Sequence, residues 1–96
     1  MLKHIVLVKL KDDSQGILPE LKERLLLMND KVDAARLVKV HLDELHSERS
    51  FDLMLEVSVD NMETLDVYQN DPYHQTQVLP FIKAHAQNVK AIDYFE

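Results

Sequence analysis

The sequence contains no cysteine and no tryptophan, and only one glycine and three prolines occur among its 96 residues. The absence of cysteine excludes disulfide scaffolds, zinc ribbons and thiol catalysis. No apolar run exceeds four residues, so no segment is apolar enough to cross a bilayer. Basic residues are also few, 11 against 17 acidic ones. The resulting net charge of −6 argues against binding to nucleic acid or to an anionic membrane surface.

The residues that are present are typical of one globular domain. Apolar residues make up 46% of the chain, far more than in a disordered protein. The length suffices for one hydrophobic core, and no repeat, linker or low-complexity tract divides the chain. We therefore expect a single domain over residues 1–96. The chain opens directly on strand-like sequence without a signal-peptide pattern, which predicts a cytoplasmic protein.

Hydrophobic periodicity predicts four strands separated by helical segments. Alternating or β-branched runs predict strands over residues 2–10, 36–45, 51–59 and 88–95. Apolar residues at intervals of three and four predict a helix over residues 18–31. A short helix is expected to begin at Asp60, and another at Asp71-Pro72 with a break or bend at Pro80.

The predicted order is therefore β-α-β-β-α-β, which is the pattern of an α+β, ferredoxin-like fold. Its four-stranded sheet is antiparallel, and the helices cover one of its faces. The first and third strands are expected to be central, and the second and fourth strands to form the edges.

The sheet face opposite the helices is predicted to carry Ile5, Leu7, Leu37 and Met54 among lysines. This mixture is too apolar for a fully hydrated face and too charged for a closed core. It predicts a homodimer in which the sheets of two copies pack face to face. The alternative is an ordinary solvent-facing sheet with a few stray apolar residues.

Four short segments, spread over nearly the whole chain, together form a distinctive pattern. They are Lys3-His4-Ile5-Val6, Phe51-Asp52-Leu53-Met54-Leu55, Tyr68-Gln69-Asn70-Asp71-Pro72-Tyr73-His74 and Ile92-Asp93-Tyr94. With them the chain resembles the stress-responsive A/B barrel domain (Dabb) family. The resemblance implies a protomer whose dimer forms an α/β barrel. Family members often carry proline or glycine near the end of the first helix and glycine late in the second strand. This chain has neither in residues 31–35 and 41–44, so we expect its loops there to differ.

Five histidines and the stretch from Tyr68 to His74 are the only residues suited to chemistry. Because the third strand runs antiparallel to the first, the topology is expected to bring His4 close to Tyr68 and His74. There His74 would act as general base and Tyr68 would orient the base or the substrate. His4 would donate a hydrogen bond to a carbonyl oxygen. A position near a helix N-terminus favours the neutral imidazole that a base requires.

The same three residues resemble those of the plant polyketide cyclase branch of the family. That resemblance implies a cyclisation without metal or cofactor, and we expect neither in this protein.

Three functions of different class fit this reasoning. In the first, the three side chains are a hydrogen-bonded plug, and the domain is a dimeric, stress-associated or scaffold-like protein without turnover. In the second, a cofactor-independent enzyme acts on a hydrophobic, carbonyl-bearing substrate. In the third, the same pocket carries a small hydrophobic ligand without chemistry. A cavity touching His4, Tyr68 and His74 would favour the last two functions over the first.

The remaining histidines carry weaker signals. His41, Asp43, Glu44 and His46 are close in sequence and include metal-ligand types. Their spacing matches no established metal site, so a solvated polar edge is the expected structure. His85 lies in helical register with apolar residues, and partial burial accounts for it.

Overall fold

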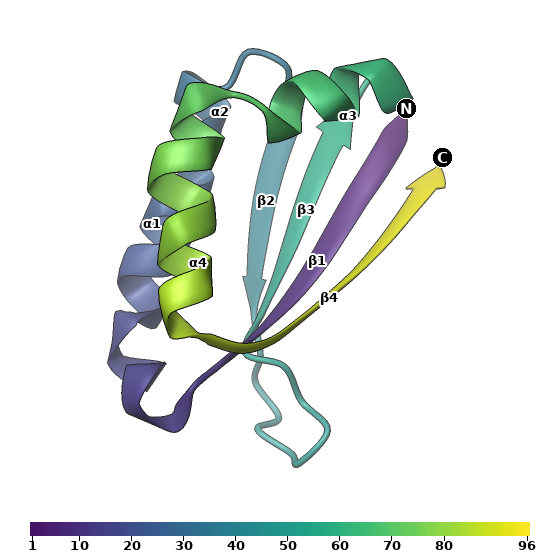
Figure 1. Cartoon of the computed structure of the whole chain (residues 1–96). Coiled ribbons are helices and arrows are strands. Elements are labelled where there is room, and N and C mark those ends of the chain that lie inside the picture. The colour runs from purple at the N-terminus through teal and green to yellow at the C-terminus, as the bar shows by residue number, and fades with distance from the viewer.

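The computed structural model describes residues 1–96 as one sheet with helices packed on one of its faces (Figure 1). The strands are β1 (Leu2–Leu10), β2 (Leu37–Leu42), β3 (Leu53–Val59) and β4 (Ala86–Phe95). The helical segments are the 3₁₀ helix η1 (Asp12–Ile17), α1 (Leu18–Leu26), α2 (Met28–Lys31), α3 (Met62–Gln69), the π-helical turn η2 (His74–Val78) and α4 (Leu79–His85). None of the helices has the length and apolar character needed to cross a membrane.

The sheet has the order β2-β3-β1-β4, and its three neighbouring pairs are antiparallel. This confirms the predicted ferredoxin-like α+β fold, with β1 and β3 in the centre and β2 and β4 at the edges. The strand bounds differ from the predicted ones by up to three residues. The largest difference is in β2, which ends at Leu42 because the chain then turns into a polar loop.

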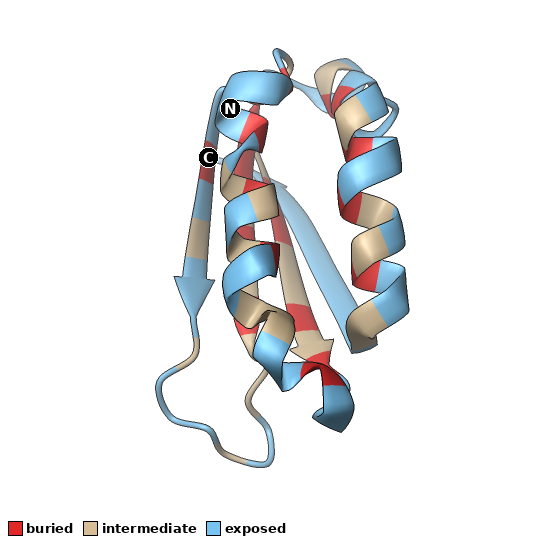
Figure 2. Cartoon of the chain, turned by 90° about the vertical axis from the view of Figure 1, so that its left-hand side faces the viewer, coloured by how far each residue is buried: buried red, intermediate tan, exposed pale blue.

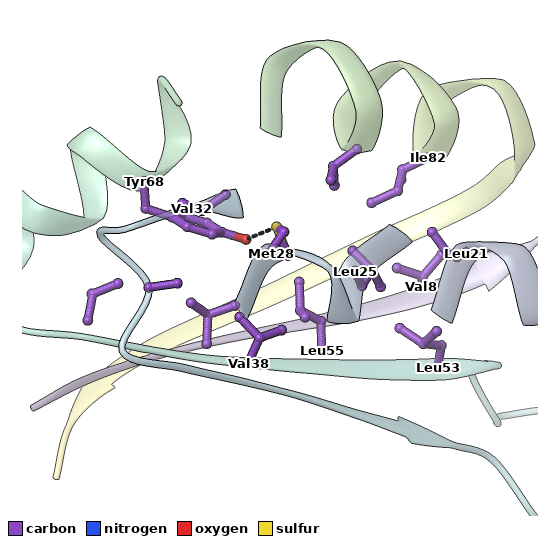
Figure 3. Close-up of a cluster of buried hydrophobic side chains, with 14 of the residues drawn as sticks. Val8, Leu21, Leu25, Met28, Val32, Val38, Leu53, Leu55, Tyr68 and Ile82 are labelled. Carbon is purple, nitrogen blue, oxygen red and sulfur yellow. Dashed lines mark hydrogen bonds between the residues drawn. The ribbon is translucent and has the colours of Figure 1, made fainter. Parts of the chain in front are cut away.

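The core lies between the sheet and the helices because alternate strand residues meet the apolar stripes of the helices. Buried residues lie where the helices face the sheet and each other (Figure 2). The most completely enclosed side chains include Leu2, Val8, Leu10, Leu21, Leu25, Met28, Val32, Leu53, Val57, Val59, Tyr68 and Val78, several of which appear in Figure 3. Burying each of the aliphatic side chains contributes about 1.5–3 kcal/mol.

The single helix predicted over residues 18–31 is divided at Leu27 into α1 and α2. Asn29 of α2 bonds to the free edge of β2: its Oδ1 accepts from Val38 N at 2.9 Å, and its Nδ2 donates to Val38 O at 3.0 Å. These bonds satisfy backbone groups that an edge strand otherwise leaves to solvent. Periodicity along the helix does not predict the Asn29 contact, because its partner lies nine residues further along the chain.

Helix α3 begins after Asn61 instead of at Asp60, which corrects the predicted start. The Asn61 side chain caps the helix by accepting a hydrogen bond from Thr64 N at 2.9 Å. Asp60 instead pairs with Arg36, with Oδ1 2.9 Å from Nε. The ion pair holds the pKa of the Asp60 carboxyl below its usual range, first through the hydrogen bond from Arg36.

The bend predicted at Pro80 takes the form of the π-helical turn η2, which immediately precedes α4. A proline inside a helix has no N–H to donate and its ring crowds the preceding turn, and the wider π turn accommodates this misfit. Arg24 of α1 stabilises the turn from outside by donating from Nη1 to the Gln77 carbonyl at 3.1 Å. The Arg24 guanidinium also lies 4.1 Å from the centre of the Phe81 ring.

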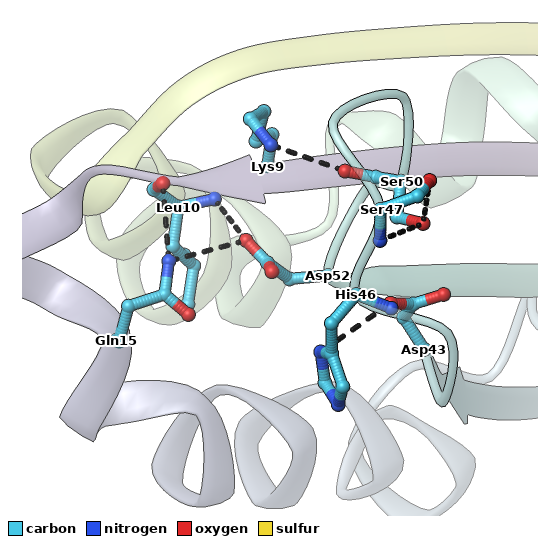
Figure 4. Close-up of polar contacts among 8 residues, drawn as sticks. All are labelled: Lys9, Leu10, Gln15, Asp43, His46, Ser47, Ser50 and Asp52. Atoms are coloured by element: carbon cyan, nitrogen blue, oxygen red, sulfur yellow. Dashed lines mark hydrogen bonds and ion pairs between the residues drawn. The ribbon is translucent and has the colours of Figure 1, made fainter.

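The loop between β2 and β3 extends beyond the sheet, and Asp52 attaches it to β1 (Figures 1 and 4). Asp52 Oδ2 accepts from Leu10 N at 2.7 Å, and Asp52 N donates to Val8 O at 2.9 Å. Lys9 Nζ donates to Ser50 O at 3.1 Å. The loop is therefore held by its base, next to the end of β1.

We expect Asp52→Ala to lower the free energy of unfolding by about 1–3 kcal/mol, because the amide of the buried Leu10 loses a charged acceptor. Asp52→Asn keeps an oxygen acceptor and should lose less. Urea unfolding of the three proteins measures the difference. Equal losses for the two variants would show that the contact with Leu10 is not the source of the stability.

Candidate functional site

His4, Tyr68 and His74 lie together between β1 and the helices, although they come from three different elements. The ring centres of His4 and Tyr68 are 5.9 Å apart, and those of Tyr68 and His74 are 4.8 Å apart. The three residues are 8%, 0% and 7% exposed. The proximity expected from the topology is therefore present, whereas the catalytic role of the three residues stays a prediction. We call them the histidine centre.

His74 is oriented by the residues that begin its helical segment. Asp71 Oδ1 accepts a hydrogen bond from Tyr73 N at 2.8 Å, which caps the turn as the sequence suggested. His74 Nδ1 lies 3.0 Å from the Gln69 carbonyl. A carbonyl only accepts, so Nδ1 carries the proton and the lone pair of the neutral ring is on Nε2.

The surroundings of His74 favour its neutral form. Burial lowers the pKa of the imidazole, and the hydrogen bond to the Gln69 carbonyl partly opposes this effect. The nearby His4 lowers the pKa further, and Asp71 raises it. The sequence indicated a neutral ring from the helix N-terminus, but desolvation is the main cause.

Asp93 is a fourth member of the centre that sequence reasoning did not connect to it. Its Oδ1 lies 2.5 Å from His4 Nδ1. An ionised carboxylate only accepts hydrogen bonds, so His4 donates from Nδ1 and directs Nε2 away from the carboxylate. A carboxylate that orients a histidine in this way is common in catalytic and metal sites. The pairing of His4 with Asp93 across β1 and β4 could have revealed the contact, but it requires the strand register.

Tyr68 contacts the histidines with its ring and not with its hydroxyl. The hydroxyl donates to Met28 Sδ at 3.5 Å, inside the core (Figure 3). Burial raises the pKa of Tyr68 well above its usual value, so the phenol stays protonated. Tyr68 therefore contacts both histidines through its ring, and its role in orienting the base or the substrate stays a prediction.

The histidine centre is buried, but one ring nitrogen of each histidine reaches solvent. Neither His4 Nε2 nor His74 Nε2 has a hydrogen-bond partner, and no buried polar side-chain atom in the protein lacks one. Both Nε2 atoms therefore reach solvent. Three surface hollows lie elsewhere, one on the outer side of α1 and two on the open sheet face, and none touches the centre. Apolar side chains fill the space between the sheet and the helices.

The sheet face opposite the helices, here called the open sheet face, has an apolar centre. It carries Ile5, Leu7, Leu37 and Met54, as predicted, and also Ile92 and Tyr94. Ile92 and Tyr94 are 63% and 41% exposed. A hollow of about 300 Å³ lies beside Leu7 and Met54.

The one acidic group in the middle of the open sheet face already has partners within the chain. Glu56, in the middle of the face, lies 3.8 Å from Lys3 Nζ and 3.7 Å from His41 Nε2. Lys3 Nζ also donates to Ser58 Oγ at 2.8 Å. A second surface could therefore cover this face without leaving Glu56 unpaired.

The other histidines lie outside the centre. His46 and Asp43 contact each other within the β2–β3 loop, whereas His41 faces Glu56. No three His, Asp or Glu side chains come together as a metal site. His85 is half-buried as expected, with Nδ1 3.0 Å from Ser14 Oγ.

Sequence and structure comparisons give a consistent result. Residues 2–96 match the family model described as Stress Responsive A/B Barrel Domain. Among curated proteins, no sequence matches this chain significantly.

Solved structures resemble the chain over nearly its whole length. A dimeric protein of unknown function and ferredoxin-like fold from Bacteroides fragilis has a TM-score of 0.87 and 24% identity, covering 99% of this chain and 95% of that chain. A dimeric ferredoxin-like protein from Thermobifida fusca has a TM-score of 0.86 and 16% identity, covering 99% and 90%. An antibiotic biosynthesis monooxygenase has a TM-score of 0.79 and 18% identity, covering 100% and 98%. At these identities the likeness shows the fold.

Proposed function

Because the chain belongs to the stress responsive A/B barrel domain (Dabb) family, we propose that it works as a homodimer in a stress-associated or scaffold-like role without turnover. In this dimer the open sheet faces of two copies pack against each other to form an α/β barrel. The observation that carries the proposal is the apolar centre of that face, with Ile92 and Tyr94 largely in solvent in the single chain.

Three further features support this assembly. The charged Glu56 already has partners within the chain, so covering it would not leave a buried charge without a partner. Both sheet edges, β2 and β4, lack a neighbouring strand on their outer side, and barrel closure is one way to protect such edges. Proteins of the same fold from Bacteroides fragilis and Thermobifida fusca are described as dimeric.

Sedimentation velocity tests the dimer. At micromolar concentration we expect a species of twice the 11.2 kDa chain mass. Leu7→Asp places a charge in the middle of the open sheet face and should give the single-chain mass. Leu45→Asp is the matched control, because Leu45 is 76% exposed in the β2–β3 loop. A wild-type protein that sediments as one chain would refute the proposal.

A second candidate function is a cofactor-independent enzyme that uses acid–base chemistry, and the solvent-reaching Nε2 atoms of His4 and His74 favour it. His74 Nε2 would remove a proton from a carbon between two carbonyl groups. The electron pair of the broken C–H bond would move to a carbonyl oxygen, forming an enolate. Donation from His4 Nε2 to that oxygen would require a second proton on the ring, because Nδ1 already donates to Asp93. A carrier of hydrophobic ligands has no comparable support.

The test of this candidate is proton exchange at the carbon between the carbonyls of a small β-keto ester, followed by NMR in deuterated buffer. The wild-type protein should accelerate the exchange above the rate in buffer alone. Exchange at the buffer rate throughout pH 6–8 would leave only the role without turnover.

A further inference from the structure

We infer that the second copy stabilises the histidine centre, because contact with the partner fixes β4, and β4 holds His4 through Asp93. This inference rests on the proposed dimer and adds a connection between its interface and the centre. Asp93 is then a positioning residue whose effect on His4 depends on assembly.

Strand β4 is an edge strand and the only strand of the sheet without a buried residue. None of its ten residues is buried, and in Figure 1 it curves away from α4. Its main attachment is the antiparallel pairing with β1, which becomes irregular between Lys9 and Leu10. An edge strand with few buried side chains opens at a lower free energy than the rest of a domain. In the single chain, β4 should therefore separate from β1 more readily than β3 does.

Successive side chains of β4 connect the two faces of the sheet. Asp93 pairs with His4 on the helix-facing side, whereas Ile92 and Tyr94 belong to the open sheet face. Ile92 lies opposite Ile5, at the apolar centre of that face. A partner that covers Ile92 and Tyr94 would hold the backbone of β4 in place, and Asp93 with it.

The state of the His4 ring follows from this attachment. With Asp93 in place, the Nδ1 proton is donated to the carboxylate. When β4 separates, Nδ1 loses this acceptor, and the ring is free to exchange between tautomers and to rotate. The dimer would thus fix which nitrogen of His4 faces the centre.

To avoid a direct effect on β4, the substitution is made at the opposite edge of the sheet. Leu37 lies on the open sheet face of β2, at the opposite edge, and is 44% exposed. Leu37→Asp should therefore affect β4 only by removing the partner copy. Amide hydrogen exchange is compared for wild type, Leu37→Asp and the control Leu45→Asp. We expect about a tenfold or greater loss of protection over residues 88–95 in the Leu37→Asp monomer, with less than about threefold change in β3.

The His4 ring provides a second measurement that a general loss of stability would not change. In the wild-type dimer, ¹⁵N NMR should show a protonated Nδ1 and a single tautomer. In the Leu37→Asp monomer the ring nitrogens should show averaged shifts. If Leu37→Asp remains dimeric, Leu7→Asp provides the same comparison.

Failure of the inference and failure of the proposed dimer give different experimental results. A monomeric variant with wild-type protection over residues 88–95 and an unchanged His4 ring would overturn the inference and leave the dimer intact. A wild-type protein that is already monomeric in sedimentation would refute the proposed dimer and, with it, the inference. Equal loss of protection in β3 and β4 would also overturn it, because it would show general destabilisation.

Discussion

Tyr68→Ala is expected to lower the free energy of unfolding by about 3–5 kcal/mol, the usual cost of removing a buried aromatic ring. Tyr68 is fully buried, and its ring contacts both histidines of the centre. Without the ring, the core would contain a cavity between α3 and the sheet. Urea or thermal unfolding measures the loss.

Tyr68→Phe is the matched variant, and we expect a change of less than about 1 kcal/mol. The hydroxyl donates only to the Met28 thioether, which is a weak acceptor. A loss of 2 kcal/mol or more in Tyr68→Phe would show that the hydroxyl has a stronger partner than the structure indicates. Wild-type exchange activity in Tyr68→Phe would further show that the phenol takes no part in chemistry.

His74→Ala should reduce any β-keto ester exchange by about 10²–10⁴-fold, the usual contribution of a general base. His46→Asn is the control, because it removes an exposed imidazole from the β2–β3 loop. Asparagine also tolerates the positive φ of 56° at that position. If His74→Ala kept more than about a tenth of the wild-type rate, His74 would not be the base.

The pH dependence follows from the lowered pKa of His74. The base must be neutral, so the rise of the exchange rate with pH should have its midpoint below the ordinary histidine value of 6.5. The same shift affects stability, because the unfolded chain binds the His74 proton more tightly than the folded chain does. Stability should therefore fall as the pH drops below 6.5 towards the folded pKa, and His74→Gln should reduce this fall.

The strand order and the face of each strand were predictable. They depend on the local alternation of apolar and polar residues and on the β-α-β-β-α-β order of a ferredoxin-like fold. Residues 51–59 alternate regularly, so β3 and its buried side chains follow from the sequence with little ambiguity. The break at Leu27 and the cap at Asn61 were not predictable in this way. The cap depends on a choice between the adjacent polar residues Asp60 and Asn61, and the contact of Asn29 with Val38 depends on tertiary packing. The cytoplasmic location is a prediction that rests on the sequence alone.

The histidine centre was predictable in its position but not in its bonding. Antiparallel pairing places His4 near the start of α3, and this brought Tyr68 and His74 to the same place. The direction of the Tyr68 hydroxyl depends on core packing against Met28, and the contact of Asp93 depends on the exact β1–β4 register. Periodicity along the sequence contains neither kind of information.

The filled interior limits the size of any molecule that the histidines could handle. Leu25 and Met28 are fully buried in the core between the sheet and the helices. A compound that reached the largely buried ring nitrogens would have to present its oxygen-bearing end and leave its hydrocarbon portion in water. Short, polar keto acids and esters meet that requirement, whereas long-chain polyketides would need the helices to move apart.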